Sequence, residues 1–124
     1  MSEATALLII AHGSRSAEAN ADAHHLAAEL ARRGPHFLAS AAFLELAEPD
    51  IDAAAARCVE RGAKRVVLLP HFLSAGTHVR RDLAAAAERL GNRFPGVEFR
   101  LAEPLGQHPL LLDILAERAR DAVS

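Results

Sequence analysis

The sequence has no tryptophan, no tyrosine and only one cysteine, Cys58. Without Trp and Tyr it lacks the usual aromatic platforms on which nucleic-acid bases stack, so we do not expect nucleic acid as a partner. A single cysteine excludes an internal disulfide framework and fits the reducing cytoplasm. An excess of one charge is also missing, because the formal net charge is −2, and this gives no basis for binding nucleic acid or a membrane surface.

Long hydrophobic runs are absent as well. The apolar run at residues 4–11 is too short to span a bilayer, and no basic segment precedes it, so we expect neither a membrane span nor a signal peptide there. What the chain does have is 124 residues, 51% of them hydrophobic, which predicts one packed domain over residues 1–124. Seven histidines are many for this length, and they direct attention to metal or proton chemistry.

Segments typical of strands and of helices alternate along the chain. Continuous apolar runs such as residues 66–69 indicate buried strands, Ser16 suits a helix N-cap, and Pro109 suits a first helical turn. Gly91 is expected to end the third helix. The resulting order βαβαβαβα predicts an α/β fold, with a four-stranded parallel sheet and helices on both faces. The expected strands are 5–11, 36–44, 63–70 and 97–102, and the expected helices are 17–33, 50–61, 77–90 and 109–122.

Histidine and glutamate residues, which can bind metals or transfer protons, follow the predicted strands. His12 follows the first strand and Glu45 the second, while His71 and His78 follow the third. Because ligands bind beyond the carboxyl ends of parallel strands, these side chains are expected to share one edge of the sheet. Two histidines and a carboxylate suit a divalent first-row metal and leave coordination positions open for a substrate. The fourth strand leads to Glu103 and His108 at the same edge.

Each of these residues also has a plainer interpretation. His12 and His78 can satisfy local backbone groups, and Glu45 can be an ordinary solvated carboxylate. His71 lies among apolar neighbours and is better explained as a packed or partly exposed side chain than as a ligand. The remaining residues have structural interpretations: His24 and His25 as solvated helix residues, His36 as a residue at the wrong end of the sheet, His108 as a neighbour of a helix N-cap, Cys58 as buried packing, and Arg80 and Arg81 as surface charges.

Four segments together resemble the sirohydrochlorin chelatase family, the CbiX/SirB group of class II chelatases. They are LLIIAHGSR at residues 7–15, AFLELAEPDI at 42–51, VVLLPHFLSAGTHVRRDL at 66–83 and EPLGQHPLL at 103–111. The resemblance covers nearly the whole chain, and the length is similar to that of the short, single-domain members.

The resemblance implies an α/β chelatase fold and insertion of a divalent metal (Co²⁺ first, with Fe²⁺ and Ni²⁺ as alternatives) into sirohydrochlorin. It implies that His12, Glu45 and His78 are the metal ligands and the catalytic groups. His71 occupies a position that is usually apolar or aromatic in the family, so it is left out of the ligand set. The short members form homodimers, which implies a homodimer here.

The implied substrate matches the residues at this edge. Sirohydrochlorin carries many carboxylates, for which Arg15, Arg80 and Arg81 are candidate anchors. Its two pyrrole N–H protons must leave, and imidazole or carboxylate can accept them. Ser14 and Gly76, together with Gly13, are expected to let the macrocycle approach the backbone closely.

Three classes of function follow from these expectations. The first is a cytoplasmic chelatase of the cobalamin or sirohaem pathway, for which the metal is a substrate and no prosthetic group is bound permanently. The second is a non-catalytic carrier of metal or tetrapyrrole with the same ligands. The third is an interaction module with a vestigial pocket. Loss of turnover with metal binding retained, when the arginines or Glu45 are changed, favours the chelatase over the carrier. No metal binding at all indicates the interaction module.

Overall fold

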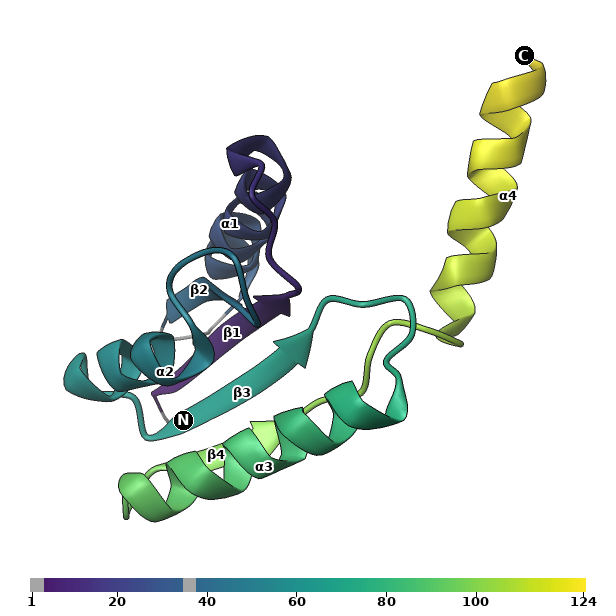
Figure 1. Cartoon of the computed structure of the whole chain (residues 1–124). Helices are drawn as coiled ribbons and strands as arrows, with labels where there is room; N and C mark the ends of the chain where they lie inside the picture. Colours follow the sequence, from purple (N-terminus) through teal and green to yellow (C-terminus); the bar gives the residue numbers. More distant parts are fainter. Residues whose placement is uncertain (1–3, 35–37) are drawn as a thin grey trace.

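The structure is a computed structural model that describes residues 4–34 and 38–124 (Figure 1). Strands and helices alternate along the whole chain, which confirms the predicted α/β order. The strands are β1 (Thr5–Ala11), β2 (Leu38–Phe43), β3 (Arg65–Pro70) and β4 (Glu98–Leu101), and the helices are α1 (Ala17–Arg33), α2 (Ile51–Glu60), α3 (Thr77–Arg93) and α4 (Pro109–Val123).

The four strands form one parallel sheet in the order β2-β1-β3-β4. Strand β1 is central, as its unbroken apolar sequence predicts, and five of its seven residues are buried. In the register of the sheet, Leu8 of β1 lies beside Ser40 of β2 and Leu68 of β3. All four strands therefore point their carboxyl ends toward the same edge.

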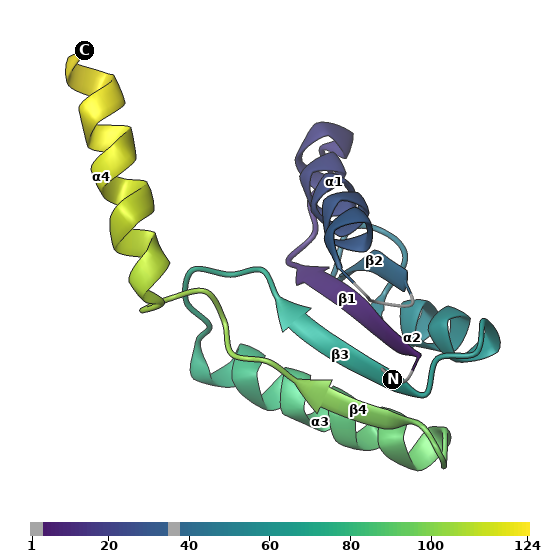
Figure 2. The ribbon, with the colours of Figure 1, turned by 180° about the vertical axis from the view of Figure 1, so that it is seen from behind.

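The larger part of the core lies between the sheet and two helices, α2 and α3. Leu8, Ile10 and Leu68 have no solvent exposure and pack there with Leu83 and Leu90 of α3. Burial of one such side chain contributes about 1.5–3 kcal/mol, so this face supplies much of the folding free energy. Helix α1 covers β1 and β2 on the opposite face, and Figures 1 and 2 show these helices on the two sides of the sheet.

The end of one helix and the ends of some strands differ from the predicted positions. Helix α3 continues through Gly91 to Arg93, so the prediction that Gly91 ends it is wrong. The Phe94 N–H donates to the Leu90 carbonyl at 2.9 Å and the Phe94 ring packs on the core, which outweighs the low helix propensity of glycine. Strands β3 and β4 are shorter than predicted, and Asp50 is the N-cap of α2. The predicted strand start at His36 lies outside the described residues.

Helix α4 does not cover either face of the sheet. It projects away from the body of the molecule (Figure 1), and none of its residues is buried. The expectation of helices on both faces is therefore met by α1, α2 and α3 alone. Within residues 4–34 and 38–124, no helix is long and apolar enough to cross a membrane.

Candidate functional site at the carboxyl edge of the sheet

The loops that follow β1 and β2 bring His12 and Glu45 together. The Glu45 N–H donates to the His12 carbonyl at 3.0 Å, and the Leu44 N–H donates to the Ala11 carbonyl at 3.0 Å. These bonds extend the parallel pairing one step beyond the strands, so the two backbones are held side by side. The His12 ring rests on Phe72, with ring centroids 4.5 Å apart, and this contact limits the orientations of the imidazole.

His12 and Glu45 line one cavity of about 480 Å³. Its other walls come from α2 and α3, including Ile51, Val79 and Asp82. The cavity therefore combines an imidazole and two carboxylates, which are metal-ligand types, with apolar side chains of the kind that line sites for organic rings.

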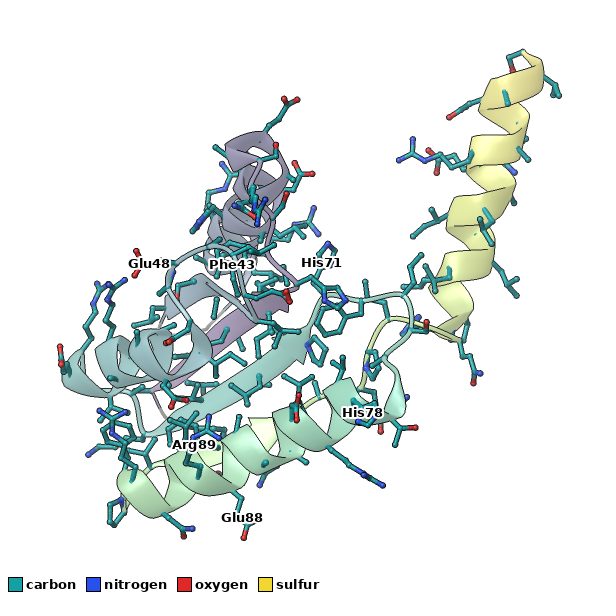
Figure 3. All side chains as sticks on the ribbon, viewed as in Figure 1. Phe43, Glu48, His71, His78, Glu88 and Arg89 are labelled. Atoms are coloured by element: carbon teal, nitrogen blue, oxygen red, sulfur yellow. The ribbon has the colours of Figure 1, made fainter. Side chains whose placement is uncertain are left out.

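Arg89 also lines this cavity, and it links the two helices α2 and α3. Its guanidinium lies 2.8 Å from a carboxylate oxygen of Asp52, joining α3 to α2 (Figure 3 labels Arg89). The hydrogen bond from Arg89 to Asp52 raises the pKa of the guanidinium above its ordinary value. Because Arg89 is already paired with Asp52, it is not a free anchor for a substrate carboxylate.

His78 does not join His12 and Glu45 in this cavity. It lies exposed in the first turn of α3, next to Val79 (Figure 3). Within the described parts of the chain, no three His, Cys, Asp or Glu side chains lie close enough to hold one metal ion. The structure thus brings two of the three predicted ligands together, and the trio of His12, Glu45 and His78 stays a prediction.

Asp82 lines the cavity and was missed in the sequence. It lies four residues after His78, and residues at that spacing share one face of a helix. The pair His78 and Asp82 was therefore detectable from the sequence as a histidine and a carboxylate on one side of α3. Arg89 lies two turns further along the same side of this helix, so its spacing was also visible in the sequence, but its pairing with Asp52 of α2 was not.

The predicted anchoring arginines do not line this cavity. Arg80 donates to the Ala75 carbonyl at 3.3 Å and lies 3.7 Å from Glu103, and it lines cavities of about 240 and 520 Å³ rather than the one beside His12. Arg15 and Arg81 are exposed. The three guanidinium groups are therefore accessible to carboxylates, but none of them lines the cavity beside His12.

Gly13, Ser14 and Gly76 were predicted to let the macrocycle approach the backbone, and the structure gives them different surroundings. Gly13 has φ of 95°, and a Cβ there would lie 1.7 Å from the Glu45 carbonyl oxygen, so this glycine is required by the fold itself. Ser14 is fixed by Asn20, whose side chain bonds its N–H at 2.9 Å and its carbonyl at 2.7 Å. Gly76 is the N-cap of α3 and has open space where a Cβ would be, so its surface is free for a ligand.

The plainer interpretations hold for several residues. His24, His25 and His71 are exposed. His108 is itself the N-cap of α4, accepting the Leu110 N–H at 3.1 Å through Nδ1. Cys58 is buried as expected, and burial raises the pKa of its thiol.

Comparison with known proteins assigns the family. The family model CbiX matches residues 6–122, and the chain belongs to this family. The chain is 37% identical over 118 residues to the sirohydrochlorin cobaltochelatase of Sulfolobus acidocaldarius, an alignment that covers 95% of this chain and 92% of that protein. It is 34% identical over 122 residues to the chloroplastic sirohydrochlorin ferrochelatase of Arabidopsis thaliana, which covers 98% of this chain but only 54% of the plant protein.

Solved structures share the fold. The putative cobalamin biosynthesis CbiX protein of Marinobacter aquaeolei superposes with a TM-score of 0.82 at 33% identity, covering 96% of this chain and 97% of that one. SirB of Bacillus subtilis subspecies spizizenii, in complex with cobalt, superposes with a TM-score of 0.84 at 26% identity, covering 94% of this chain and 50% of SirB. The chain therefore corresponds to nearly all of the Marinobacter protein and to about half of SirB.

Proposed function

We propose that this protein is a sirohydrochlorin chelatase, which inserts a divalent metal ion into sirohydrochlorin in cobalamin or sirohaem biosynthesis. The observation that carries the proposal is that His12 and Glu45 line one cavity of about 480 Å³ in a chain of the CbiX family. Relatives named for the same substrate, one a cobaltochelatase and one a ferrochelatase, support it. The metal ion is a substrate in this proposal, and the reaction needs no permanently bound cofactor.

The proposed chemistry divides metal binding from proton removal. His12, Glu45 and His78 bind the incoming metal, since neutral imidazole and carboxylate are suitable ligands for first-row divalent ions. As the metal enters the ring, two pyrrole N–H protons leave, and a histidine or Glu45 that is released from the metal accepts them. Asp82 adds a second carboxylate to the same cavity and a further proton acceptor.

The physiological metal is proposed to be Co²⁺, with Fe²⁺ and Ni²⁺ as alternatives. All three ions accept histidine and carboxylate ligands, and their order of affinity follows the metal more than the site. The relatives named above include one protein assigned to cobalt and one to iron. Competition between Co²⁺ and Fe²⁺ for the same protein is the direct way to choose between them.

Substrate binding is proposed to use charged and backbone groups around the strand ends. Arg15, Arg80 and Arg81 pair with the carboxylates of the macrocycle, because guanidinium binds carboxylate through two parallel hydrogen bonds. Ser14 and the open surface at Gly76 receive its edge.

A homodimer in the cytoplasm completes the proposal. The homodimer comes from the resemblance to short members of the family. The cytoplasm is supported by the single buried, unpaired cysteine, since disulfides form mainly in oxidising compartments.

The test is the absorbance of sirohydrochlorin with Co²⁺ or Fe²⁺ over time, with and without the protein. We expect the protein to accelerate metal insertion with turnover, and His12→Ala, His78→Ala and Glu45→Gln each to lower the rate by about 100-fold or more. His25→Ala and Glu48→Gln are the matched controls, because both residues are exposed and lie away from the cavity.

Each outcome has a distinct meaning. Equal loss in the site variants and their controls would remove the proposed roles of His12, Glu45 and His78. Insertion at the spontaneous rate in every sample would reject the chelatase. Stoichiometric metal or tetrapyrrole binding without turnover would identify a carrier instead.

A further inference from the structure

A second cavity lies beside the edge strand β2. It has a volume of about 470 Å³, and α1 and α2 flank the strand there (Figure 1). Among the residues that the structure describes, none lines both this cavity and the one beside His12. The cavity beside His12 takes Ile51 from the start of α2, whereas the second cavity uses the middle and the end of that helix. The two are therefore separate, and we call the second one the edge cavity.

The α2 wall of the edge cavity is basic. Arg57 and Arg61 lie four positions apart, so they share one side of the helix with the buried Cys58. Both arginines are exposed, and within residues 4–34 and 38–124 neither forms an ion pair. Glu60 also lines the cavity, but the two guanidinium groups outnumber its carboxylate. This wall therefore offers two unpaired cations one helical turn apart.

Polar groups also border the floor and the opposite wall. Burial raises the pKa of the Cys58 thiol, whereas a hydrogen bond with Ser40 and the charge of Arg61 act in the opposite direction. The Arg61 guanidinium thus lies close enough to the floor for its charge to act there. On the α1 side, the His24 ring meets the Phe43 ring edge-on with centroids 5.4 Å apart, which limits the orientations of the imidazole.

Small apolar side chains form much of the remaining lining. Alanines come from both helices and from the strand, and Leu38 stands at the start of β2. Their small size leaves the volume open, and their aliphatic surface suits a short carbon chain better than a bare inorganic ion. The helix residues of this kind are Ala27, Ala28 and Ala54.

The edge of β2 is too short on its open side for a peptide strand to pair with it. The Phe43 N–H donates outward to the Pro49 carbonyl at 2.9 Å, and backbone groups alternate in direction along a strand. Ala39 and Ala41 therefore point their N–H and C=O groups to the same outer side. Ala41 is only 1% exposed, so Ala39 alone is accessible. A small ligand fits this edge better than an extended peptide.

We propose that the edge cavity binds a small organic dicarboxylate. Arg57 and Arg61 each pair with one carboxylate, because guanidinium donates two parallel hydrogen bonds to this group. Side chains four positions apart on a helix start about 5–6 Å apart, which matches the ends of a chain of about five carbons, such as glutarate. The carbon chain lies against the alanines. This site needs neither metal nor tetrapyrrole, so it does not depend on the proposed chelatase activity.

The first test is calorimetric titration of the full chain with glutarate, in a metal-free buffer of fixed ionic strength. We expect Arg57→Gln and Arg61→Gln each to weaken binding by about 10-fold or more, because each removes a charged hydrogen-bonding partner. Acetate, with one carboxylate, should bind the wild type more weakly by a similar factor. Arg93→Gln is the matched control, since Arg93 is an exposed arginine of α3 that does not line the cavity, and its affinity should equal that of the wild type.

The second test locates the bound glutarate by nuclear magnetic resonance. The amide signals of Ser40 and Arg61 should shift on titration, while those of Arg80 and Arg81, which are proposed to bind substrate carboxylates, should not. Ala28→Leu narrows the cavity without changing its charge, and it should also weaken binding by about 10-fold. Because Ala28 is exposed and leucine is a good helix former, this variant should keep the wild-type melting temperature.

Four results would overturn the proposal. The first is no binding at millimolar glutarate. The second is an equal loss of affinity in Arg93→Gln, which would indicate non-specific attraction to surface charge. The third is a set of shifts confined to Arg80 and Arg81, which would place the ligand elsewhere. The fourth is tighter binding of an acidic hexapeptide than of glutarate at the same signals, which would identify a peptide site. An active chelatase that binds no glutarate would lose only this proposal, and an inactive protein that binds it would keep it.

Discussion

Gly13 is a residue that both the backbone fold and the candidate site require to be glycine. It directly follows His12, has positive φ, and leaves no room for a side chain against the Glu45 carbonyl. A side chain there would force apart the two loops that hold His12 beside Glu45.

We expect Gly13→Ala to lower the free energy of unfolding by about 2 kcal/mol or more, since it combines backbone strain with a collision. Gly96→Ala is the matched control, because Gly96 also has positive φ but open space around its Cβ position, and it should cost about 1 kcal/mol. Urea denaturation of both variants measures the difference. Equal losses would mean that the contact with Glu45 adds nothing beyond the strain.

The buried thiol of Cys58 predicts how stability changes with pH. Burial raises the pKa of its thiol above the ordinary value near 9, although a hydrogen bond with Ser40 acts in the opposite direction. A raised pKa means that the neutral thiol is the form compatible with the fold, so this contribution to stability is present below pH 9 and is lost as pH rises through the folded-state pKa.

We expect a maleimide to modify Cys58 slowly in the native protein at neutral pH and rapidly in denaturant. The native rate should climb only at alkaline pH, where the fold weakens. Mass spectrometry of timed samples measures both rates. Rapid native modification at pH 7 would show that the α2 side of the sheet opens readily.

At the scale of elements, α3 is the helix that most needs support at its first turn. Its N-cap is Gly76, which supplies no side-chain acceptor, whereas α1 and α2 are capped by Ser16 and Asp50. The N-terminal N–H groups of α3 are thus left for solvent or for an anionic ligand.

We expect Gly76→Ser to raise the free energy of unfolding by a few tenths of a kcal/mol, because serine is the better N-cap and its Cβ meets no atom. The same change should slow metal insertion if the macrocycle approaches Gly76 as proposed. Thermal denaturation and the insertion assay together separate the two effects. A more stable variant with an unchanged insertion rate would remove Gly76 from the substrate site.

Much of the fold was predictable element by element, because local patterns and packing agree. Strand β1 and helix α1 begin and end where their apolar runs and caps predict. The predicted end of the third helix at Gly91 was wrong because Phe94, just after the helix, packs against the core. The local sequence does not reveal this contact.

The candidate site was predictable only in part. The edge that carries His12 and Glu45 follows from parallel topology alone, because every strand ends there. Which side chains share a cavity depends on how α2 and α3 pack over that edge. This is why Asp82 and Arg89 were missed and why His78 and Arg80 were expected closer to His12 than they lie.

At the scale of the whole molecule, the proposed homodimer would link stability to protein concentration through α4. An isolated helix of 15 residues is marginal in water, and α4 has no buried residue within its own chain. If the proposed homodimer covers this helix, association and folding are linked.

We expect the melting temperature to rise with protein concentration over a range of about 100-fold, and the far-ultraviolet helix signal to fall on dilution. Differential scanning calorimetry and circular dichroism measure the two quantities. A wild type with a constant melting temperature would contradict the linkage.

The strand order β2-β1-β3-β4 also leaves the sheet with two unequal edges. Strand β4 is four residues long and carries Glu98 and Arg100, and charges on a short strand discourage pairing with stray chains. Strand β2 is six residues long and has no charged side chain, and its last residue is shielded through the bond from the Phe43 N–H to the Pro49 carbonyl at 2.9 Å. Aggregation of a partly unfolded population would therefore begin at β2.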